Sequence, residues 1–386
     1  MAKTLIYINK NKLRNCGGPV GYCNNLFFEL NKRENEDVKF IDAKVNKTKW
    51  YASLKKNKLA LFCKRLSSNY KLIYGKKHFT SINLNEYDII HFHSTRDMYQ
   101  VRDSLKNYQG KILLTSHSPT IASKEALVNR NKFEIKMFSW LFNKLIRMDE
   151  YAFERADYIL FPCEDAEEPY HLEWEGFKKV KTTKPFKYIL TGINGCSAKI
   201  SEKEIREKYN IPQDAFVICY VGRHNSIKGY DKLLEIGEKV LEKYDNVYFL
   251  IAGKEGPMYG LKNSRWIEVG WTNDPHSFIA ASDLFILPNK HTYFDLVLLE
   301  VLSLGKSVLM TYTGGNKYVH KLNKGGLFVY NDVHEALSNI DKLYELGREK
   351  LNEVGLSNKE IFNENFTVEK FTDRYLEILD EVINEK

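Results

Sequence analysis

Short apolar runs alternate along the chain with longer segments in which apolar side chains recur every three or four positions. The short runs predict buried strands, the longer segments predict helices, and their alternation predicts parallel sheets with helices on both faces. In the first half, strands are expected at Thr4 to Ile8, Val38 to Ile41, Asp88 to His91, Lys111 to Thr115, Tyr158 to Phe161 and Lys187 to Leu190. In the second half, strands are expected at Phe216 to Val221, Val247 to Ala252, Trp266 to Val269, Leu284 to Leu287, Ser307 to Met310 and Gly326 to Val329, with helices such as Gly229 to Tyr244 and Val297 to Leu304.

A chain of 386 residues is too long for one hydrophobic core and fits two domains of about 150 to 200 residues each. Between the halves, residues 191–201 are rich in small and turn-forming residues, and we place a hinge there. Ser201 and Glu204 form an S-x-x-E capping box, which predicts the first helix of the second domain. The amphipathic stretch at the end predicts a helix that either stays on the second domain or crosses back to the first. The expected division is residues 1–190, 191–365 and 366–386 for the two domains and the final helix.

The six cysteines are scattered, with no C-x-x-C pair and no metal-like clustering with the ten histidines. This distribution favours reduced thiols in a cytosolic protein. The N-terminal residues lack the apolar core and the small-residue cleavage site of a signal peptide, and no apolar run is long enough to span a bilayer. We therefore expect a cytoplasmic protein, either soluble or attached peripherally to the inner face of the plasma membrane.

Residues 44–77 carry eleven lysines and arginines and no acidic residue. Trp50, Tyr51, Phe62 and several leucines are interleaved with these bases, which is the composition of a basic helix at the surface of an anionic membrane. A solvated helix in a lysine-rich protein is the alternative. Nucleic acid is not expected as a partner, because the sequence contains none of the usual nucleic-acid-binding motifs.

A loop with two cations follows the strand expected at Phe216 to Val221. Gly222 ends the strand, and Arg223 and Lys228 come shortly after it. Ligands of open α/β folds bind at the carboxyl edge of the sheet, where a guanidinium fork and an ammonium group can hold the oxygens of a diphosphate. The alternative is that both residues are ordinary surface charges. No D-x-D or other divalent-metal motif is present, so no metal ligand is predicted.

Glu300 is the one carboxylate in the apolar run from Leu296 to Leu302. A lone ionised carboxylate is costly to bury without a partner, and we expect that partner to be a ligand. The turn Thr313-Gly314-Gly315 follows the strand expected at Ser307 to Met310, and its backbone amides can approach an anion closely because glycine has no Cβ. A plain tight turn is the alternative.

Glycines and histidines follow the strands of the first half. Gly17 and Gly18 lie between the first strand and an expected helix, in a pattern that only loosely resembles a dinucleotide-binding fingerprint. His91, His93 and His117 lie at the ends of neighbouring strands, where an imidazole can hydrogen-bond to a sugar hydroxyl or a phosphate. A structural role is the alternative for any single histidine.

Taken in order along nearly the whole chain, these segments resemble the retaining glycosyltransferases of family 4, which have the GT-B fold of two facing Rossmann-like domains. The resemblance covers the glycine loop at Gly17-Gly18, the strand ends DIIHFHS and LLTSHSP, the phosphate loop GRHNSIKGYDKL, the segments VGWTND, ASDLFILPN and FDLVLLEVLSLGKSVLMTYTGG, and the final helix FTVEKFTDRYLEI. The expected fold is therefore α/β of the GT-B class, with a parallel sheet in each domain.

The resemblance also implies roles for individual residues. It implies that Arg223 and Lys228 neutralise the donor's diphosphate as it leaves, and that Glu300 holds the ribose hydroxyls of the nucleotide. Two positions depart from the family's pattern, because Thr292 stands where a glutamate usually contacts the transferred sugar and Asp295 stands where glycine usually precedes the helix. The full expected set is catalytic Arg223, Lys228 and His117; nucleotide-sugar-binding Gly17, Gly18, Gly222, Thr292, Asp295, Leu296 and Glu300; and acceptor-side His91 and His93.

The function implied by the resemblance is that of a retaining, metal-independent, hexosyltransferase-like glycosyltransferase. We expect it to move a sugar from a nucleoside diphosphate, UDP in preference to GDP, to a saccharide, lipid-linked or protein acceptor in bacterial surface polysaccharide or glycoconjugate synthesis, without a cofactor. The departure at Thr292 leaves a second hypothesis open, a catalytically silent GT-B partner or chaperone of an active glycosyltransferase. A third, a nucleotide-binding oxidoreductase, depends only on the N-terminal glycines.

Overall fold

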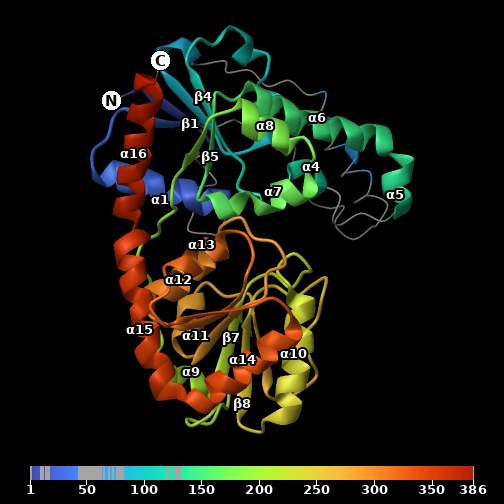
Figure 1. Cartoon of the computed structure of the whole chain (residues 1–386), viewed down its shortest axis with the longest axis vertical. Helices are drawn as coiled ribbons and strands as arrows, with labels where there is room; N and C mark the ends of the chain where they lie inside the picture. The colour runs from blue at the N-terminus through green and yellow to red at the C-terminus, as the bar shows by residue number, and fades with distance from the viewer. Residues whose placement is uncertain are drawn as a thin grey trace. The chain divides into compact units, whose positions relative to one another are not determined.

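The chain forms two compact units, each with a six-stranded sheet (Figure 1). Unit 1 consists of residues 1–161, 170–189 and 372–386, and unit 2 consists of residues 162–169 and 190–371. The domain boundaries expected at 190 and 365 remain predictions. The computed structural model describes residues 2–8, 13, 18–41, 63, 66, 67, 70, 71, 74, 82–118, 121–125 and 132–385. Gly17 and most of residues 44–77 therefore lie outside the described residues.

The sheet of unit 1 is parallel throughout, in the strand order β2-β1-β3-β4-β5-β6. From β1 the chain adds β2 on one side of the sheet, and it then adds β3 to β6 on the other side of β1. The carboxyl ends of β1 and β3 are therefore the topological switch point of the unit. The strands are β1 (Thr4–Tyr7), β2 (Val38–Ile41), β3 (Ile89–Phe92), β4 (Lys111–Thr115), β5 (Tyr158–Phe161) and β6 (Phe186–Tyr188). The α-helices along this part of the chain are α1 (Pro19–Lys32), α3 (Thr95–Gln100), α4 (Ala122–Glu125), α5 (Lys132–Met137), α6 (Ser139–Arg155), α7 (Glu168–Glu173) and α8 (Phe177–Thr183), and the short 3-10 helices are η3 (Leu84–Glu86), η4 (Ser104–Asn107) and η5 (Glu164–Glu167).

The sheet of unit 2 is also parallel throughout, in the order β12-β11-β10-β7-β8-β9. This is the doubly wound Rossmann order, whose switch point lies between its first and fourth strands, here β7 and β10. The strands are β7 (Phe216–Val221), β8 (Val247–Ala252), β9 (Trp266–Gly270), β10 (Leu284–Leu287), β11 (Ser307–Thr311) and β12 (Leu327–Tyr330). The helices are α9 (Glu202–Lys208), α10 (Tyr230–Lys243), α11 (Pro275–Ala280), α12 (Leu296–Ser303), α13 (Gly315–Lys321), α14 (Val333–Leu346) and α15 (Arg348–Asn365).

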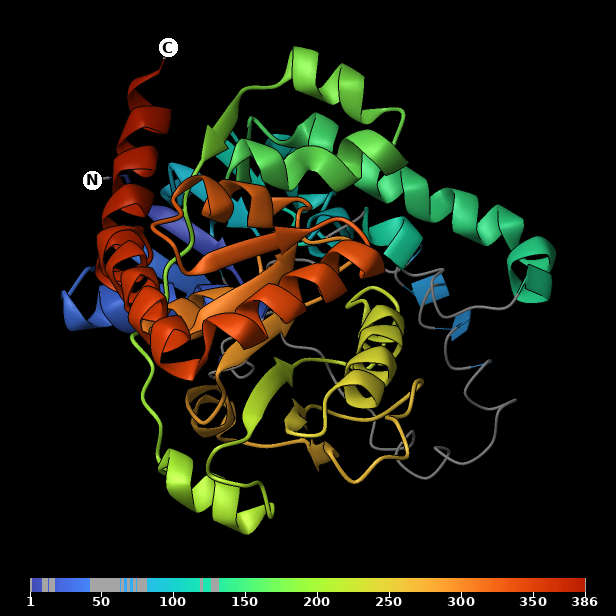
Figure 2. The ribbon, with the colours of Figure 1, turned by 60° about the horizontal axis from the view of Figure 1, so that its bottom comes forward.

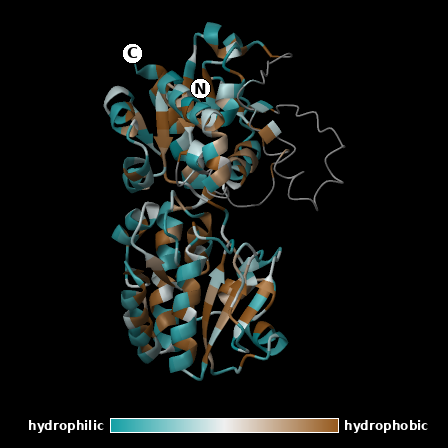
Figure 3. Ribbon diagram, turned by 90° about the vertical axis from the view of Figure 1, so that its right-hand side faces the viewer, coloured by the Kyte–Doolittle hydropathy of each residue, from teal (hydrophilic) through white to brown (hydrophobic). Residues whose placement is uncertain are grey.

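Both faces of the unit 2 sheet are covered, because successive side chains of a strand point to opposite faces. Along β7, Val217 and Cys219 pack into one buried cluster, and Ile218 and Tyr220 pack into another. Helices α9, α11 and α12 contribute to the first cluster, α10 and α14 contribute to the second, and α15 contributes to both (Figures 1 and 2). The strands are apolar along most of their length, while the helices turn hydrophilic residues outward (Figure 3). The packed sheet therefore holds the loops at its carboxyl edge in place.

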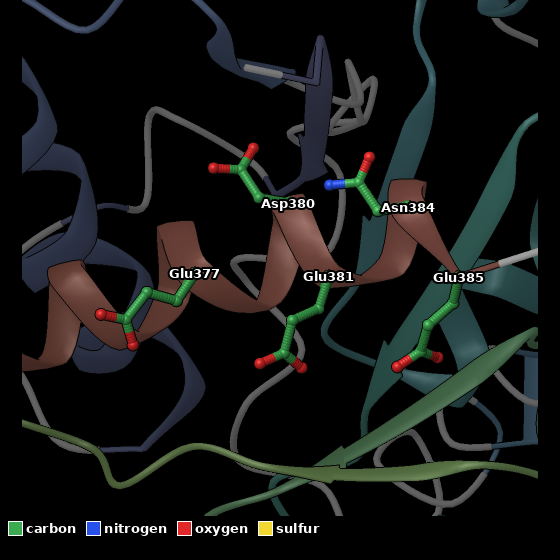
Figure 4. Close-up of a pocket in the computed structure, with 5 residues that line it drawn as sticks. All are labelled: Glu377, Asp380, Glu381, Asn384 and Glu385. Carbon is green, nitrogen blue, oxygen red and sulfur yellow. The ribbon is translucent and has the colours of Figure 1, made fainter.

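The last helix, α16 (Val368–Asn384), packs along unit 1 with its C-terminal part. Its Tyr375 hydroxyl is 2.9 Å from Nδ1 of His91, and Lys187 Nζ is 2.9 Å from Glu381 Oε2. Figure 4 shows a surface pocket on this helix, lined by Glu377, Asp380, Glu381, Asn384 and Glu385. In the part of the chain that the structure describes, no helix is long and apolar enough to cross a membrane.

Candidate functional site

Two loops meet at the switch point of unit 2, one after β7 and one after β10. The Lys290 amide donates to the Ile227 carbonyl at 3.1 Å. Gly229 adopts φ +64°, and a Cβ at this position would lie only 1.6 Å from the carbonyl oxygen of Pro288. Glycine is therefore required there on two grounds, backbone conformation and space. The two loops consequently keep a fixed register against each other.

Lys228 is held by the chain's own Asp295 across this junction. Lys228 Nζ lies 2.5 Å from Asp295 Oδ2, and the Asn289 side-chain amide donates to the same oxygen at 2.5 Å. Burial opposes ionisation of Asp295, but Lys228, Asn289 and the nearby Arg223 together hold the pKa of Asp295 below its ordinary value. Asp295 precedes α12, yet its side chain makes no capping hydrogen bond to that helix. The structure thus brings together Arg223, Lys228 and Asp295 from the sequence-based set and adds Asn289.

Arg223 is exposed, and its backbone is held by Tyr220 of β7. The Tyr220 hydroxyl donates to the Arg223 carbonyl at 2.9 Å, and a Cβ at Gly222 would lie 2.6 Å from that hydroxyl. The Gly222-Arg223 step therefore packs closely on Tyr220 and leaves the guanidinium at the surface of the carboxyl edge. The guanidinium can therefore bind an anion from solvent while the backbone of Arg223 stays fixed.

Thr292 has little room for a ligand contact. The residue is only 3% exposed, and a Cβ at Gly314 would lie 2.0 Å from the Thr292 carbonyl oxygen. The turn at Gly314 therefore covers the position at which relatives are expected to place a glutamate. Leu296, the first residue of α12, is half-buried beside this region.

Glu300 has a partner within the protein, whereas from the sequence we expect a ligand in that role. Its side chain is 27% exposed, and His276 Nε2 lies 3.7 Å from Glu300 Oε2. Leu298, Leu299 and Val301 take the core face of α12, so Glu300 falls on the half-buried face. The Cys196 thiol and the Glu300 carboxylate, acting against burial, raise the pKa of His276 from 6.5 to about 10.

This raised pKa predicts a pH-dependent contribution to stability. Because His276 holds its proton more tightly in the folded state, its contribution is complete below about pH 6.5 and is lost as the pH rises toward about 10. His276→Gln is expected to flatten the decline of the unfolding free energy over this interval, measured by urea denaturation at a series of pH values. The exposed His334 on α14 gives the matched control, His334→Gln. An unchanged pH profile in His276→Gln would show that the ion pair with Glu300 does not form in solution.

The Thr313-Gly314-Gly315 turn binds a carboxylate of the chain itself, that of Glu168. The Gly314 amide donates to Glu168 Oε2 at 2.6 Å, and Lys317 Nζ lies 3.0 Å from Glu168 Oε1. Residues 162–169 belong to unit 2, which makes this contact internal to the unit. Glu168 was not singled out by any sequence pattern, because 146 residues separate it from Gly314.

The three histidines of unit 1 form one cluster, in which His91 and His93 are buried and His117 is half-buried. His93 Nδ1 lies 2.8 Å from His117 Nε2, and His91 Nε2 lies 2.9 Å from the Thr115 hydroxyl. Burial lowers the pKa of all three imidazoles, to about 3 for His91 and His117, so they are neutral at physiological pH. His91 is satisfied on both nitrogens, by Thr115 and Tyr375, which fits a structural role.

His93 differs from His91 in one respect. The residue is 5% exposed, and its Nε2 has no hydrogen-bond partner among the described residues. Gly18, with φ +75°, directly precedes α1, and Tyr22 of that helix packs on the rings of His93 and His117. The switch point of unit 1 therefore carries a neutral imidazole nitrogen able to bind a polar group. Within the described residues, no group of three or more His, Cys, Asp or Glu side chains could hold a metal ion.

Comparisons of the sequence with known proteins relate this chain to glycosyltransferases. Residues 201–360 match the family model described as glycosyl transferases group 1. Trehalose synthase from Pyrococcus horikoshii is 29% identical over 194 residues, 45% of this chain and 46% of that relative. The lipopolysaccharide core biosynthesis glycosyltransferase LpsE from Rhizobium meliloti is 25% identical over 184 residues, 45% of this chain and 52% of that relative. The chain spans about half the length of the curated relatives it matches.

Solved structures extend the likeness in fold to the whole chain. Sucrose-phosphate synthase from Thermosynechococcus elongatus has a TM-score of 0.68 at 15% identity, covering 100% of both chains. Anabaena HepE in complex with UDP and glucose has a TM-score of 0.63 at 14% identity, covering 98% of this chain and 100% of that one. The fold is that of the GT-B class, as expected from the sequence. The match of residues 201–360 to the glycosyl transferases group 1 model agrees with the resemblance stated above.

Proposed function

We propose that the chain is a glycosyltransferase that moves a sugar from a nucleoside diphosphate to an acceptor. The observation that carries this proposal is the loop at the switch point of the group 1 domain, with the exposed Arg223 and the half-buried Lys228 beside each other at the carboxyl edge. Both cations lower the pKa of the same carboxylate, Asp295, so an anion bound beside Asp295 can contact both of them. A diphosphate has the charge and the spread of oxygens for this role.

In the proposed reaction, these cations offset the negative charge that grows on the diphosphate as the sugar leaves. The sugar meanwhile develops oxocarbenium character. Glu300 accepts hydrogen bonds from the ribose hydroxyls, with His276 behind it holding the carboxylate in place. We propose retention of the anomeric configuration, with the donor phosphate taking the acceptor's proton, and we propose that the two cations serve without a metal ion.

A donor that binds in this site meets a carboxylate that is already paired there, that of Asp295. When the diphosphate binds, the Lys228 ammonium must either leave Asp295 or contact Asp295 and the diphosphate together. Thr292 is covered by the Gly314 turn, so the sugar contact made by glutamate in relatives passes in our proposal to Asp295. His117 and the open nitrogen of His93 in unit 1 are proposed to bind hydroxyl groups of the substrates, and His91 to support them.

The proposed donor is a UDP sugar, and the proposed acceptor is a saccharide, a lipid-linked glycan or a protein. Support comes from the solved HepE complexes with UDP and with UDP-glucose, and from relatives named for lipopolysaccharide core and O-antigen biosynthesis. We place the reaction in the cytoplasm, with peripheral attachment to the inner face of the plasma membrane. The basic residues 44–77 predicted for that attachment lie mostly outside the described residues.

A catalytically silent GT-B protein is the second candidate, because Thr292 is buried and Lys228 is already neutralised by Asp295. A panel of UDP and GDP sugars distinguishes the two, with nucleotide release and nucleotide binding both measured. We expect release of UDP from at least one donor, accelerated by acceptor glycans. Nucleotide binding without release would support the silent protein, and absence of both binding and release for every donor would sink the transfer reaction.

A further inference from the structure

Three large apolar side chains lie exposed within eight residues of one another on unit 1. Phe133 and Met137 of α5 are 70% and 46% exposed, and Trp140 at the start of α6 is 51% exposed. Single exposed apolar residues are ordinary, but a group of them needs an explanation. Both ribbon views place α5 at the outer end of α6, away from the sheet of the unit (Figures 1 and 2).

The inner faces of these helices are already occupied, so the three side chains cannot turn inward. Leu141, Phe142, Leu145 and Met148 of α6 form a buried cluster. Ile135 packs against this cluster from α5, and Phe138 does so from the connection between the helices. The outward position of Phe133, Met137 and Trp140 is therefore fixed by the packing of their neighbours, and it leaves a surface without a cover in the described part of the chain.

Tyr74, which belongs to the basic stretch noted in the sequence, lies beside this surface. Tyr74, one of the few described residues of that stretch, is 42% exposed, and the Lys144 ammonium donates a hydrogen bond to its hydroxyl. Lys144 Nζ also lies 4.8 Å from the centre of the Tyr74 ring and 5.8 Å from that of Trp140. These contacts place Tyr74 beside Lys144 and Trp140 at the start of α6.

The charge of this surface is positive. From residue 132 to residue 147 the chain carries Lys132, Lys136, Lys144 and Arg147 against the single acid Glu134. Lys132 and Lys136 are exposed and directly precede Phe133 and Met137, so bases and apolar side chains alternate along α5. This composition, with aromatic residues beside lysines on an outward helix face, is typical of helices that lie at the surface of an anionic bilayer.

We propose that a surface formed by Tyr74, Lys132, Phe133, Lys136, Met137 and Trp140, here called the α5–α6 patch, docks on an anionic lipid bilayer. The apolar side chains enter the headgroup region, and the lysines pair with anionic headgroups. An acidic protein would satisfy the lysines but offers no apolar layer for three side chains of this size. The inference rests on the membrane attachment proposed above, to which it assigns a surface and a lipid class, and it does not depend on which sugar is transferred.

The test is flotation of the full chain with vesicles of pure phosphatidylcholine and with vesicles in which about a quarter of the lipid is phosphatidylglycerol. We expect binding to the anionic vesicles only. The triple variant Phe133→Ser, Met137→Ser, Trp140→Ser is expected to lower this binding about tenfold or more. The matched control is Phe28→Ser with Leu172→Ser, which removes side chains 58% and 70% exposed elsewhere on unit 1.

The outcomes separate this inference from the proposed reaction. Nucleotide release from a soluble donor is expected to be unchanged in the triple variant, which also shows that the variant is folded. Anionic vesicle binding equal to that of the wild type in the triple variant would overturn the α5–α6 patch, as would absence of vesicle binding by the wild type. A concentration-dependent dimer that the triple variant abolishes, without vesicle binding, would assign the surface to a second copy of the chain and overturn the lipid proposal. Failure of the donor panel would remove the transfer reaction and leave vesicle binding as a separate result.

Discussion

Arg223→Ala is expected to lower kcat for sugar transfer about a hundred- to a thousandfold, because it removes a preorganised cation from the oxygens that gain charge in the transition state. Stability should hardly change, since Arg223 is exposed. Nucleotide release under saturating donor gives kcat, and thermal unfolding gives the stability. Lys232→Ala on α10 is the matched control, since it removes another exposed cation, with a side chain 48% exposed, from the helix that follows the loop.

Arg223→Lys sharpens this test. A lysine keeps the charge but loses the planar fork, so partial recovery of kcat is expected if the guanidinium binds two oxygens of a diphosphate. Retention of full activity in Arg223→Ala would place the reacting diphosphate elsewhere. A loss of activity accompanied by an equal loss in Lys232→Ala would indicate a general effect of surface charge instead of a specific contact.

Removing Lys228 is expected to affect both activity and stability, since Asp295 then loses its main counter-charge. Lys228→Ala should reduce kcat about a hundredfold or more. It should also lower the free energy of unfolding by about 1 to 3 kcal/mol, because the side chain of Asp295 is only 13% exposed and would lose its main counter-charge. Urea denaturation and nucleotide release measure the two effects separately.

The double variant Lys228→Ala, Asp295→Asn separates the two roles of Lys228. We expect it to regain most of the lost stability, because the uncompensated carboxylate is gone, and to stay inactive, because the diphosphate still lacks its cation. The pair Lys243 and Asp341, whose side chains are 55% and 34% exposed at 2.7 Å, serves as a control pair remote in sequence from the loop. Recovery of activity in the double variant would mean that Lys228 serves only to neutralise Asp295.

Local signals were sufficient to predict most elements of the fold. The expected strands at Phe216 to Val221 and Val247 to Ala252 match β7 and β8 residue for residue, and the capping box at Ser201 forms with Glu204. These features depend on neighbouring residues alone, which is why a sequence pattern predicts them. The last strand of the first half was less accurate, since β6 runs from Phe186 to Tyr188. It is a partly exposed edge strand whose extent is set by its pairing with β5.

The partners within the candidate site could not be predicted in the same way. Lys228 and Asp295 are 67 residues apart, and they meet only because β7 and β10 are neighbours in the sheet. The sequence indicated the importance of both residues but not the ion pair between them. His276 and Glu168 were missed altogether, because each lies in an ordinary polar stretch and gains its role from contacts distant in sequence.

The most direct measurement is a crystal structure of the chain with a UDP sugar, or with UDP where no donor is hydrolysed. We expect the diphosphate against Arg223 and Lys228 at the carboxyl ends of β7 and β10, and the ribose hydroxyls donating to Glu300. Asp295 should then face the sugar or share Lys228 with the diphosphate. A nucleotide that lies away from both cations, with Lys228 still paired only to Asp295, would contradict the proposed site.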